Sequence, residues 1–275
     1  MTAAAQVPAG APMISFKGAG KSFITKDNKV LRAFRDVDLD IAAGEFLALV
    51  GPSGCGKSTL LNVLAGLTEI TAGEVMLGGH RPGGSKLDIG YVFQQDSVLP
   101  WIRVQANIEL GLKLRGWPPA KRRERAVEWL AKIGLPGFGE AFPAELSGGM
   151  RKRVALAACL AYDPDVLFMD EPFGALDAQT RILLQDELLR LWQERRQTVV
   201  FVTHDIGEAI VMADRVIVMT ARPARIKTDY RIDLPRPRSA AETRFHPKFD
   251  GLYRAIWDDL RPELAAQPTP ERGAA

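Results

Sequence analysis

The chain has 275 residues, 47% of them hydrophobic and 25% charged, which is typical of a globular protein large enough to bury a sizeable core. Its 36 Lys and Arg nearly balance 33 Asp and Glu, and the formal net charge of +3 gives no sign of a nucleic-acid-binding surface. The two cysteines, Cys55 and Cys159, indicate neither a disulfide framework nor a zinc cluster, and they fit a reducing cytoplasm.

The two ends of the chain differ in composition from the rest. Residues 1–12 are rich in Ala, Pro and Gly without a basic segment followed by an apolar one, so we expect a disordered leader rather than a signal peptide. We expect the main domain at 13–238, a C-terminal helical extension at 239–266 and a disordered tail at 267–275. The apolar runs are far shorter than the ~20 residues that cross a bilayer, which predicts that any membrane role is peripheral.

Two kinds of strand pattern alternate with helical patterns along the main domain. Short alternating segments predict an antiparallel lobe, at 13–17, 34–41, 74–77 and 89–93. Bulky runs without alternation predict strands buried on both faces of a parallel sheet, at 45–51, 165–170, 198–204 and 215–220. These patterns favour an α/β fold with helices on both sides of the parallel sheet.

Helical patterns occupy the middle and the end of the chain. The change of pattern after Ser97 predicts an inserted helical subdomain at about 97–164. A last helical stripe follows a segment rich in Pro and Arg, and consists of Phe249, Leu252, Tyr253, Ile256, Trp257 and Leu260. Docking of this stripe on the domain's own core is favoured over docking on a partner, although both remain open.

The most informative motif joins the expected strand that ends at Val50 to a helical pattern at 60–67. Strand, glycine-rich loop and helix in this order predict a phosphate-binding loop, because the glycines let backbone N–H groups turn inward at a helix N-terminus. Lys57 is expected to face the β- and γ-phosphates and Ser58 to ligate Mg²⁺. By itself the loop fits kinases, GTPases and motors equally. Its candidate nucleotide-binding residues are Gly51, Pro52, Ser53, Gly54, Cys55, Gly56, Lys57, Ser58 and Thr59.

A pair of carboxylates, Asp170 and Glu171, follows the buried pattern at 166–169. Ligands of parallel sheets bind at the carboxyl ends of the strands, so both side chains are expected near the phosphates. Because the chain turns at a strand end, Asp170 can support Mg²⁺ while Glu171 reaches an attacking water as general base.

A third motif, Leu146-Ser-Gly-Gly-Met150, precedes this strand by a short helix and resembles the signature motif of ABC-transporter ATPases. The resemblance extends from Phe23 to about Arg225, with the other family motifs in the same order. It implies an ABC ATPase domain with a P-loop NTPase core, an antiparallel β lobe and the inserted helical subdomain. It also implies ATP hydrolysis with ATP and Mg²⁺ as cofactors.

The resemblance assigns further roles residue by residue. Phe23 stands where the family places an aromatic residue that stacks on adenine. Gln94, favoured over the adjacent Gln95, matches the glutamine that touches Mg²⁺ and the attacking water, and His204 matches the histidine that contacts the γ-phosphate. Asp177 lies in a segment similar to the loop that crosses to the partner subunit. The implied catalytic residues are therefore Glu171, His204 and Gln94, and the implied metal ligands are Ser58, Gln94 and Asp170.

The signature segment predicts a composite site. Ser147, Gly148 and Gly149 lead into a helical pattern, and a helix N-terminus suits an anionic γ-phosphate. In the family this end meets ATP held by a second copy, which implies a head-to-tail dimer. Met150 departs from the pattern, because many relatives have Gln there.

Further segments, 91–101, 171–181 and 220–225, resemble the nitrate/sulfonate/taurine importer subfamily. This implies membrane-spanning permease partners, an indirect link to a solute-binding protein, and a peripheral place on the cytoplasmic face of the inner membrane. One alternative is a non-transport ABC ATPase acting on DNA or ribosomes, although the chain has neither a second ATPase half nor a long coiled coil. A small-molecule kinase would leave the signature motif unexplained.

Overall fold

The computed structural model describes residues 11–266 except positions 96 and 175. Most of the expected leader at 1–12 and the whole expected tail at 267–275 lie outside the described residues. Across the described part of the chain, no helix combines the length and apolarity needed to cross a membrane.

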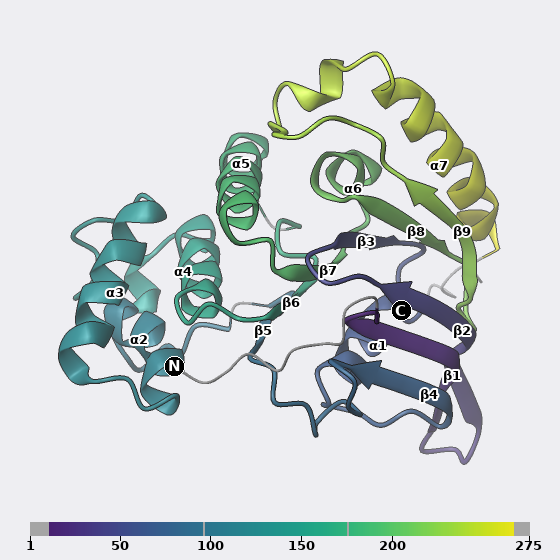
Figure 1. The fold of residues 1–275 in the computed structure, drawn as a ribbon, viewed down its shortest axis with the longest axis horizontal. Helices are drawn as coiled ribbons and strands as arrows, with labels where there is room; N and C mark the ends of the chain where they lie inside the picture. The colour runs from purple at the N-terminus through teal and green to yellow at the C-terminus, as the bar shows by residue number, and fades with distance from the viewer. Residues whose placement is uncertain (1–10, 96, 175, 267–275) are drawn as a thin grey trace, which may run out of the picture.

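A six-stranded sheet forms the centre of the molecule, in the order β5-β6-β7-β3-β8-β9 (Figure 1). All neighbouring strands are parallel except β8 and β9, which are antiparallel. The strands are β3 (Phe46–Val50), β5 (Ile89–Val92), β6 (Val166–Asp170), β7 (Thr198–Val202), β8 (Arg215–Met219) and β9 (Ile226–Arg231). The sequence analysis predicted four of them close to these bounds but missed β9.

The antiparallel lobe has three strands in the order β2-β1-β4, namely β1 (Ile14–Ile24), β2 (Val30–Ile41) and β4 (Ala72–Leu77). The prediction that the segment at 89–93 belongs to this lobe is wrong, because β5 pairs in parallel with β6. As an edge strand β5 buries alternate residues only, which mimics an antiparallel pattern. A β-carbon at Gly90 would lie 2.8 Å from the Leu167 side chain, so glycine permits this close pairing.

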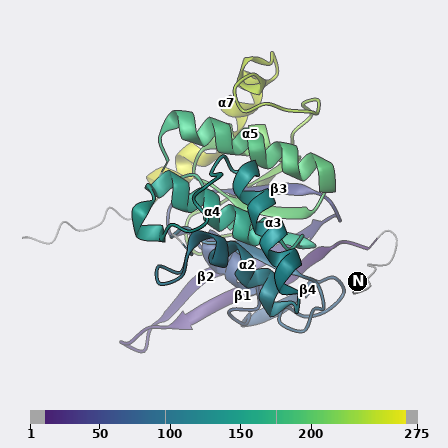
Figure 2. The ribbon, with the colours of Figure 1, turned by 90° about the vertical axis from the view of Figure 1, so that its left-hand side faces the viewer.

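Helices cover both faces of the central sheet (Figures 1 and 2). On one side α1 (Lys57–Leu64) lies between the sheet and the lobe, and on the other lie α5 (Ala178–Arg195), α6 (Ile206–Met212) and α7 (Phe249–Ala265). A separate group packs together beyond the β5 edge, made of α2 (Val104–Leu114), α3 (Pro119–Lys132) and α4 (Gly148–Leu160). The α/β fold with a parallel sheet, an antiparallel lobe and a helical group is confirmed.

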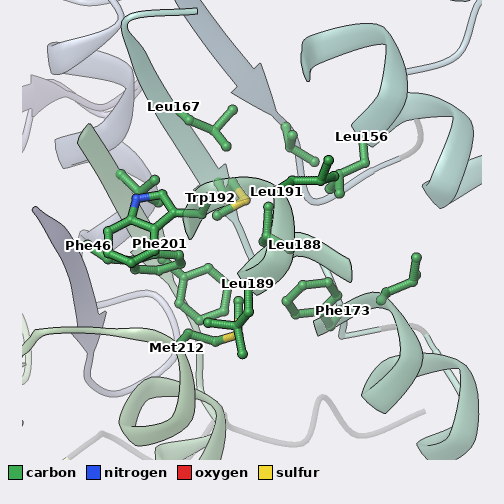
Figure 3. Close-up of a cluster of buried hydrophobic side chains, with 14 of the residues drawn as sticks. Phe46, Leu156, Leu167, Phe173, Leu188, Leu189, Leu191, Trp192, Phe201 and Met212 are labelled. Carbon is green, nitrogen blue, oxygen red and sulfur yellow. The ribbon is translucent and has the colours of Figure 1, made fainter. Parts of the chain in front are cut away.

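The core explains why the central strands lack alternation. In β3, Phe46, Ala48 and Val50 pack with the α5 and α6 side, whereas Leu47 and Leu49 pack with α1 and the lobe. Figure 3 shows the first cluster, in which the Phe46 and Trp192 rings meet edge to face with 5.5 Å between centroids. Both faces are therefore apolar, and polar groups are confined to the strand ends.

Candidate active site

The phosphate-binding loop follows β3 and opens into α1. Gly54 and Gly56 have positive φ angles of 69° and 131°, and a β-carbon at Gly56 would lie 2.8 Å from the Ala33 carbonyl oxygen. The buried Lys57 Nζ donates to the carbonyl oxygens of Gly51 and Pro52, at 2.8 and 2.9 Å. Gly51 and Pro52 therefore hold the side chain of Lys57, and all three are predicted residues of the loop. The ammonium group of Lys57 lies inside the turn of the loop.

Asp170 and Glu171 end β6 beside this loop. The Glu171 backbone has a φ of 46°, and its N–H donates to the Val202 carbonyl oxygen of β7 at 2.9 Å. This turn sends the two carboxylates in different directions. Burial raises the pKa of Asp170, and a hydrogen bond from the Ser58 hydroxyl opposes the shift. Asp170 Oδ1 is buried and has no hydrogen-bond partner among the described residues.

Three predicted side chains converge at the ends of β5, β6 and β7. Gln94 Nε2 donates to Glu171 Oε2 at 3.2 Å, and His204 Nδ1 lies 3.3 Å from the same oxygen. Their approach follows from the sheet order, which places these three strands side by side. Lys152 of α4 fixes the segment before the helical group by donating to the Phe93 and Gln94 carbonyl oxygens at 2.9 and 2.7 Å.

A cavity of about 230 Å³ lies between the loop and these strand ends. Its lining consists of Ser53, Gly54, Gly56, Lys57, Ser58, Thr59, Gln94, Glu171 and Arg222. Cys55 is buried on the inner side of the loop, where burial raises the pKa of its thiol while the charge of Lys57 opposes that rise. Polar hydroxyls, a lysine and inward-turned backbone groups suit this cavity to a polyphosphate.

The remaining predicted residues lie elsewhere. Phe23 is near the end of β1 with 39% of its surface exposed, and Lys21 Nζ is 4.8 Å from its ring centroid. Ser147 caps α4 by accepting from the Met150 N–H at 3.3 Å, and Asp177 caps α5 by accepting from Gln179 and Thr180 N–H groups. Gly148 and Gly149 form the first turn of α4, and Gly149 lies against Leu176 and Thr180.

Two residues near the site were not found from the sequence. Arg222 lines the cavity from the loop after β8, and Lys152 supports the backbone at Gln94. Arg222 lies in segment 220–225, which resembles the importer subfamily but carried no predicted contact with the nucleotide, and Lys152 lies in none of the predicted motifs. Lys152 lies 58 residues from Gln94, so only the packing of α4 beside β5 reveals the contact.

Comparison with known proteins agrees with this geometry. The family model described as ABC transporter matches residues 34–174. An uncharacterised ABC transporter ATP-binding protein of Methanocaldococcus jannaschii is 49% identical over 244 residues, covering 89% of this chain and 91% of the relative. The chain belongs to the ABC transporter family. Its membership makes it an ATP-binding subunit and an ATPase, as the motifs predicted.

Other relatives carry transport names. A taurine import ATP-binding protein of Roseobacter denitrificans is 42% identical over 252 residues, 89% of this chain and 94% of the relative. An aliphatic sulfonates import ATP-binding protein of Bacillus cereus is 40% identical over 232 residues, 84% and 91% of the two chains. A solved dimeric ATP-binding cassette in a post-hydrolysis state, bound to ADP and Pi, is 32% identical with a TM-score of 0.73 and covers 81% of this chain and 100% of that one.

Proposed function

We propose that this ABC ATPase energises the uptake of a small anion, such as taurine, a sulfonate or nitrate, through partner permease subunits. The import proteins among its relatives support the transport direction and the class of solute. The observation that carries the catalytic part is the meeting of Gln94 and His204 at one oxygen of Glu171, beside the phosphate-loop cavity.

In this proposal the loop holds the phosphates and Glu171 handles the proton. Lys57 and the backbone of residues 51–59 bind the β- and γ-phosphates, and Glu171 accepts a proton from the attacking water. Gln94 orients the same water through its contact with Glu171. His204 contacts the γ-phosphate from the end of β7. The strand ends keep these groups in place before the substrate arrives, which lowers the cost of positioning them.

The chain's own residues also fit a Mg²⁺ site. Asp170 Oδ1 is a buried carboxylate oxygen without a hydrogen-bond partner in the described part of the chain, and the Ser58 hydroxyl lies beside that carboxylate. Hydroxyl and carboxylate oxygens are the donors that Mg²⁺ prefers. Ser58, Asp170 and Gln94 would hold the ion. When bound, Mg²⁺ supplies positive charge that offsets the charge of the phosphates.

A second copy would complete each site. Ser147 and Gly148, both exposed, and the half-buried Gly149 form a helix N-terminus that suits the γ-phosphate of ATP held by the partner, and Asp177 would approach the same interface. The similar dimeric cassette supports this arrangement. Phe23 would stack on adenine within its own subunit.

We further propose the division predicted from the sequence, with the ATPase domain at 13–238, its helical subdomain at about 97–164 and the extension at 239–266. The assembly would lie on the cytoplasmic face of the inner membrane, beside the permease, and would act with a solute-binding protein. Both partners follow from the importer assignment.

Uptake by the source organism tests the proposal. Cells that lack the gene are offered labelled taurine, an alkanesulfonate or nitrate, and are complemented with the wild type, Glu171→Gln or the control Glu194→Gln on an exposed part of α5. We expect uptake of one of these anions to require the wild type or the control. Unchanged uptake of all three after deletion would refute the solute class.

Affinity purification from native membranes tests the assembly separately. We expect the chain to bring down proteins with several membrane spans. Ribosomes or DNA in place of those proteins would support a non-transport ABC ATPase instead.

A further inference from the structure

β8 and the loop that follows it contact the phosphate-binding loop at two points. A β-carbon at Gly51 would lie 3.1 Å from both the Met219 side chain and its carbonyl oxygen, so the end of β8 contacts the start of the phosphate loop. Three residues beyond Met219, the Nη2 of Arg222 donates to the Gly54 carbonyl oxygen.

The position of this arginine is fixed from two directions within the domain. The Thr220 N–H donates to the Arg225 carbonyl oxygen at 3.0 Å, which closes the turn. Ala224 exchanges hydrogen bonds of 3.0 Å with β2, donating to Ala33 and accepting from the Arg35 N–H. Since Ala33 also touches Gly56, the turn and the phosphate loop share one support.

Arg222 differs from the neighbouring Arg225 in its charge environment. Arg225 pairs with the Asp36 carboxylate. Among the described residues Arg222 has no carboxylate partner, and its one hydrogen bond goes to the Gly54 carbonyl oxygen. A guanidinium has five N–H donors, so most of its capacity remains available. It lines the same cavity as Lys57 and Ser58.

The C-terminal helix holds the residue next to this arginine. Glu263 of α7 accepts from the Ala221 N–H at 2.9 Å and pairs with Lys227 Nζ at 3.0 Å. A continuous series of contacts therefore runs from α7 through the Ala221 backbone to Arg222 and the phosphate loop. A second anchor of α7, Asp259, accepts from Thr228 and Tyr230 on β9, away from the cavity.

We propose that Arg222 binds the phosphate chain of the nucleotide in its own subunit, and that Glu263 is a positioning residue for this contact. The inference rests on the proposed nucleotide site and adds a binding residue to which the sequence assigned no role in nucleotide binding. An unpaired guanidinium beside a polyphosphate site makes charge-assisted, often bidentate, hydrogen bonds. In this proposal α7 contributes to nucleotide binding, because Glu263 holds the loop that carries Arg222.

Equilibrium binding of MgATP and MgADP to the full chain tests the contact. Arg222→Ala should raise both Kd values about tenfold, as expected for the loss of a charge-assisted hydrogen bond. Arg222→Lys should recover part of the affinity because it keeps the charge. Arg225→Ala, three positions along the same turn, is the matched control and should leave the Kd near that of the wild type.

The salt dependence of nucleotide binding distinguishes a lost charge contact from a distorted loop. The ratio between the Kd values of Arg222→Ala and the wild type should shrink from low salt to about 1 M, where the Debye length falls to about 3 Å. A ratio that is independent of salt would mean that the variant acts by distorting the loop. Unchanged or tighter binding in Arg222→Ala would also overturn the proposal.

The positioning role of Glu263 is tested by its coupling to Arg222. Glu263→Ala should raise the Kd for MgATP about threefold in the wild type and add nothing to Arg222→Ala, since coupled residues are not additive. Glu263→Gln should restore binding because its amide oxygen still accepts from Ala221. Asp259→Ala controls for weaker docking of α7 and should lower thermal stability without this effect. Additive losses would remove Glu263 from the proposal.

Nucleotide binding by Lys57→Ala and by the wild type distinguishes a failure of this inference from a failure of the proposed function. Lys57→Ala should lose nucleotide binding more severely than any of these variants, because its buried cation is lost from the loop. A wild-type chain that binds no ATP would refute the proposed function itself. A Lys57→Ala defect with a normal Arg222→Ala would refute only the inference.

Discussion

The phosphate-loop cavity and the N-terminal end of α4 differ in how far a single chain completes them. In the cavity, the groups already contact one another: Lys57 is held by two carbonyl oxygens, and Gln94 and His204 meet at Glu171. At α4, the exposed Ser147 accepts one hydrogen bond from its own helix, and Gly148 is open to solvent. The groups of the first region are held in place within one chain, whereas the second is a surface suited to an anion supplied from outside.

The contrast follows from the elements that carry the two regions. Neighbouring parallel strands end at one edge, so three strand ends bring their polar residues within hydrogen-bond reach. The N-terminus of α4 presents its unpaired N–H groups along the helix axis, and the exposed Ser147 and Gly148 leave that end open to solvent. One chain therefore supplies two different halves of the proposed composite site, and variants in each half should fail in different ways.

Glu171→Gln should give the largest effect, because it removes the proposed proton acceptor from the more complete region. We expect hydrolysis to slow by roughly 10²–10⁴-fold, the range for a lost general base. ATP binding should persist, since Lys57 and Asp170 are unchanged. Turnover and ATP-dependent mass, measured on one preparation, should show a slow enzyme that is a dimer with ATP and a monomer without it.

Two outcomes would limit this assignment. Normal turnover in Glu171→Gln would remove this carboxylate from the mechanism and leave it a solvated strand end. Slow turnover without a dimer would support Glu171 as the general base but contradict the composite site. Glu194→Gln, on the exposed side of α5, controls for the loss of a surface charge.

Ser147→Arg addresses the less complete region and should have a smaller but still large effect. Loss of one preorganised donor typically costs about 10²-fold or more in kcat, and the larger side chain also obstructs the proposed interface. A monomer should still bind ATP, because Ser147 lies outside the lining of the cavity. Equilibrium dialysis measures the binding and light scattering the dimer. Normal dimerisation with normal hydrolysis would show that the two halves do not meet.

The same contrast explains what the sequence could predict. The positions of the phosphate loop and of the end of β6 were predicted because each follows a short apolar run bounded by polar or glycine-rich residues, and in the loop the glycine-rich motif leads into a helical pattern. The sequence placed β5 in the wrong sheet, because the four residues of this edge strand alternate between half-buried and buried positions, as those of an antiparallel strand do. The contact of Arg222 with Gly54 was not predicted, because it depends on packing against β2 and α7, which no local sequence pattern indicates.

The smallest expected effect belongs to Phe23, which lies outside both regions and tests how far the nucleotide site extends along the lobe. Stacking of a base on an aromatic ring contributes about 1 kcal/mol at the low end of its range, so Phe23→Ala should weaken MgATP binding roughly fivefold. Phe23→Trp should retain the affinity, and Ile24→Ala, next to it and 75% exposed, is the matched control.

Inorganic tripolyphosphate distinguishes a contact with the adenine ring from a contact with the phosphates. It has no ring to stack, so its affinity should be the same in Phe23→Ala and the wild type, whereas Arg222→Ala should weaken it. Equal losses for ATP and tripolyphosphate in Phe23→Ala would mean that the substitution disturbs the lobe. Because β1 pairs with β2, which supports Gly56 through Ala33, such a disturbance would reach the phosphate loop through the backbone and not through the base.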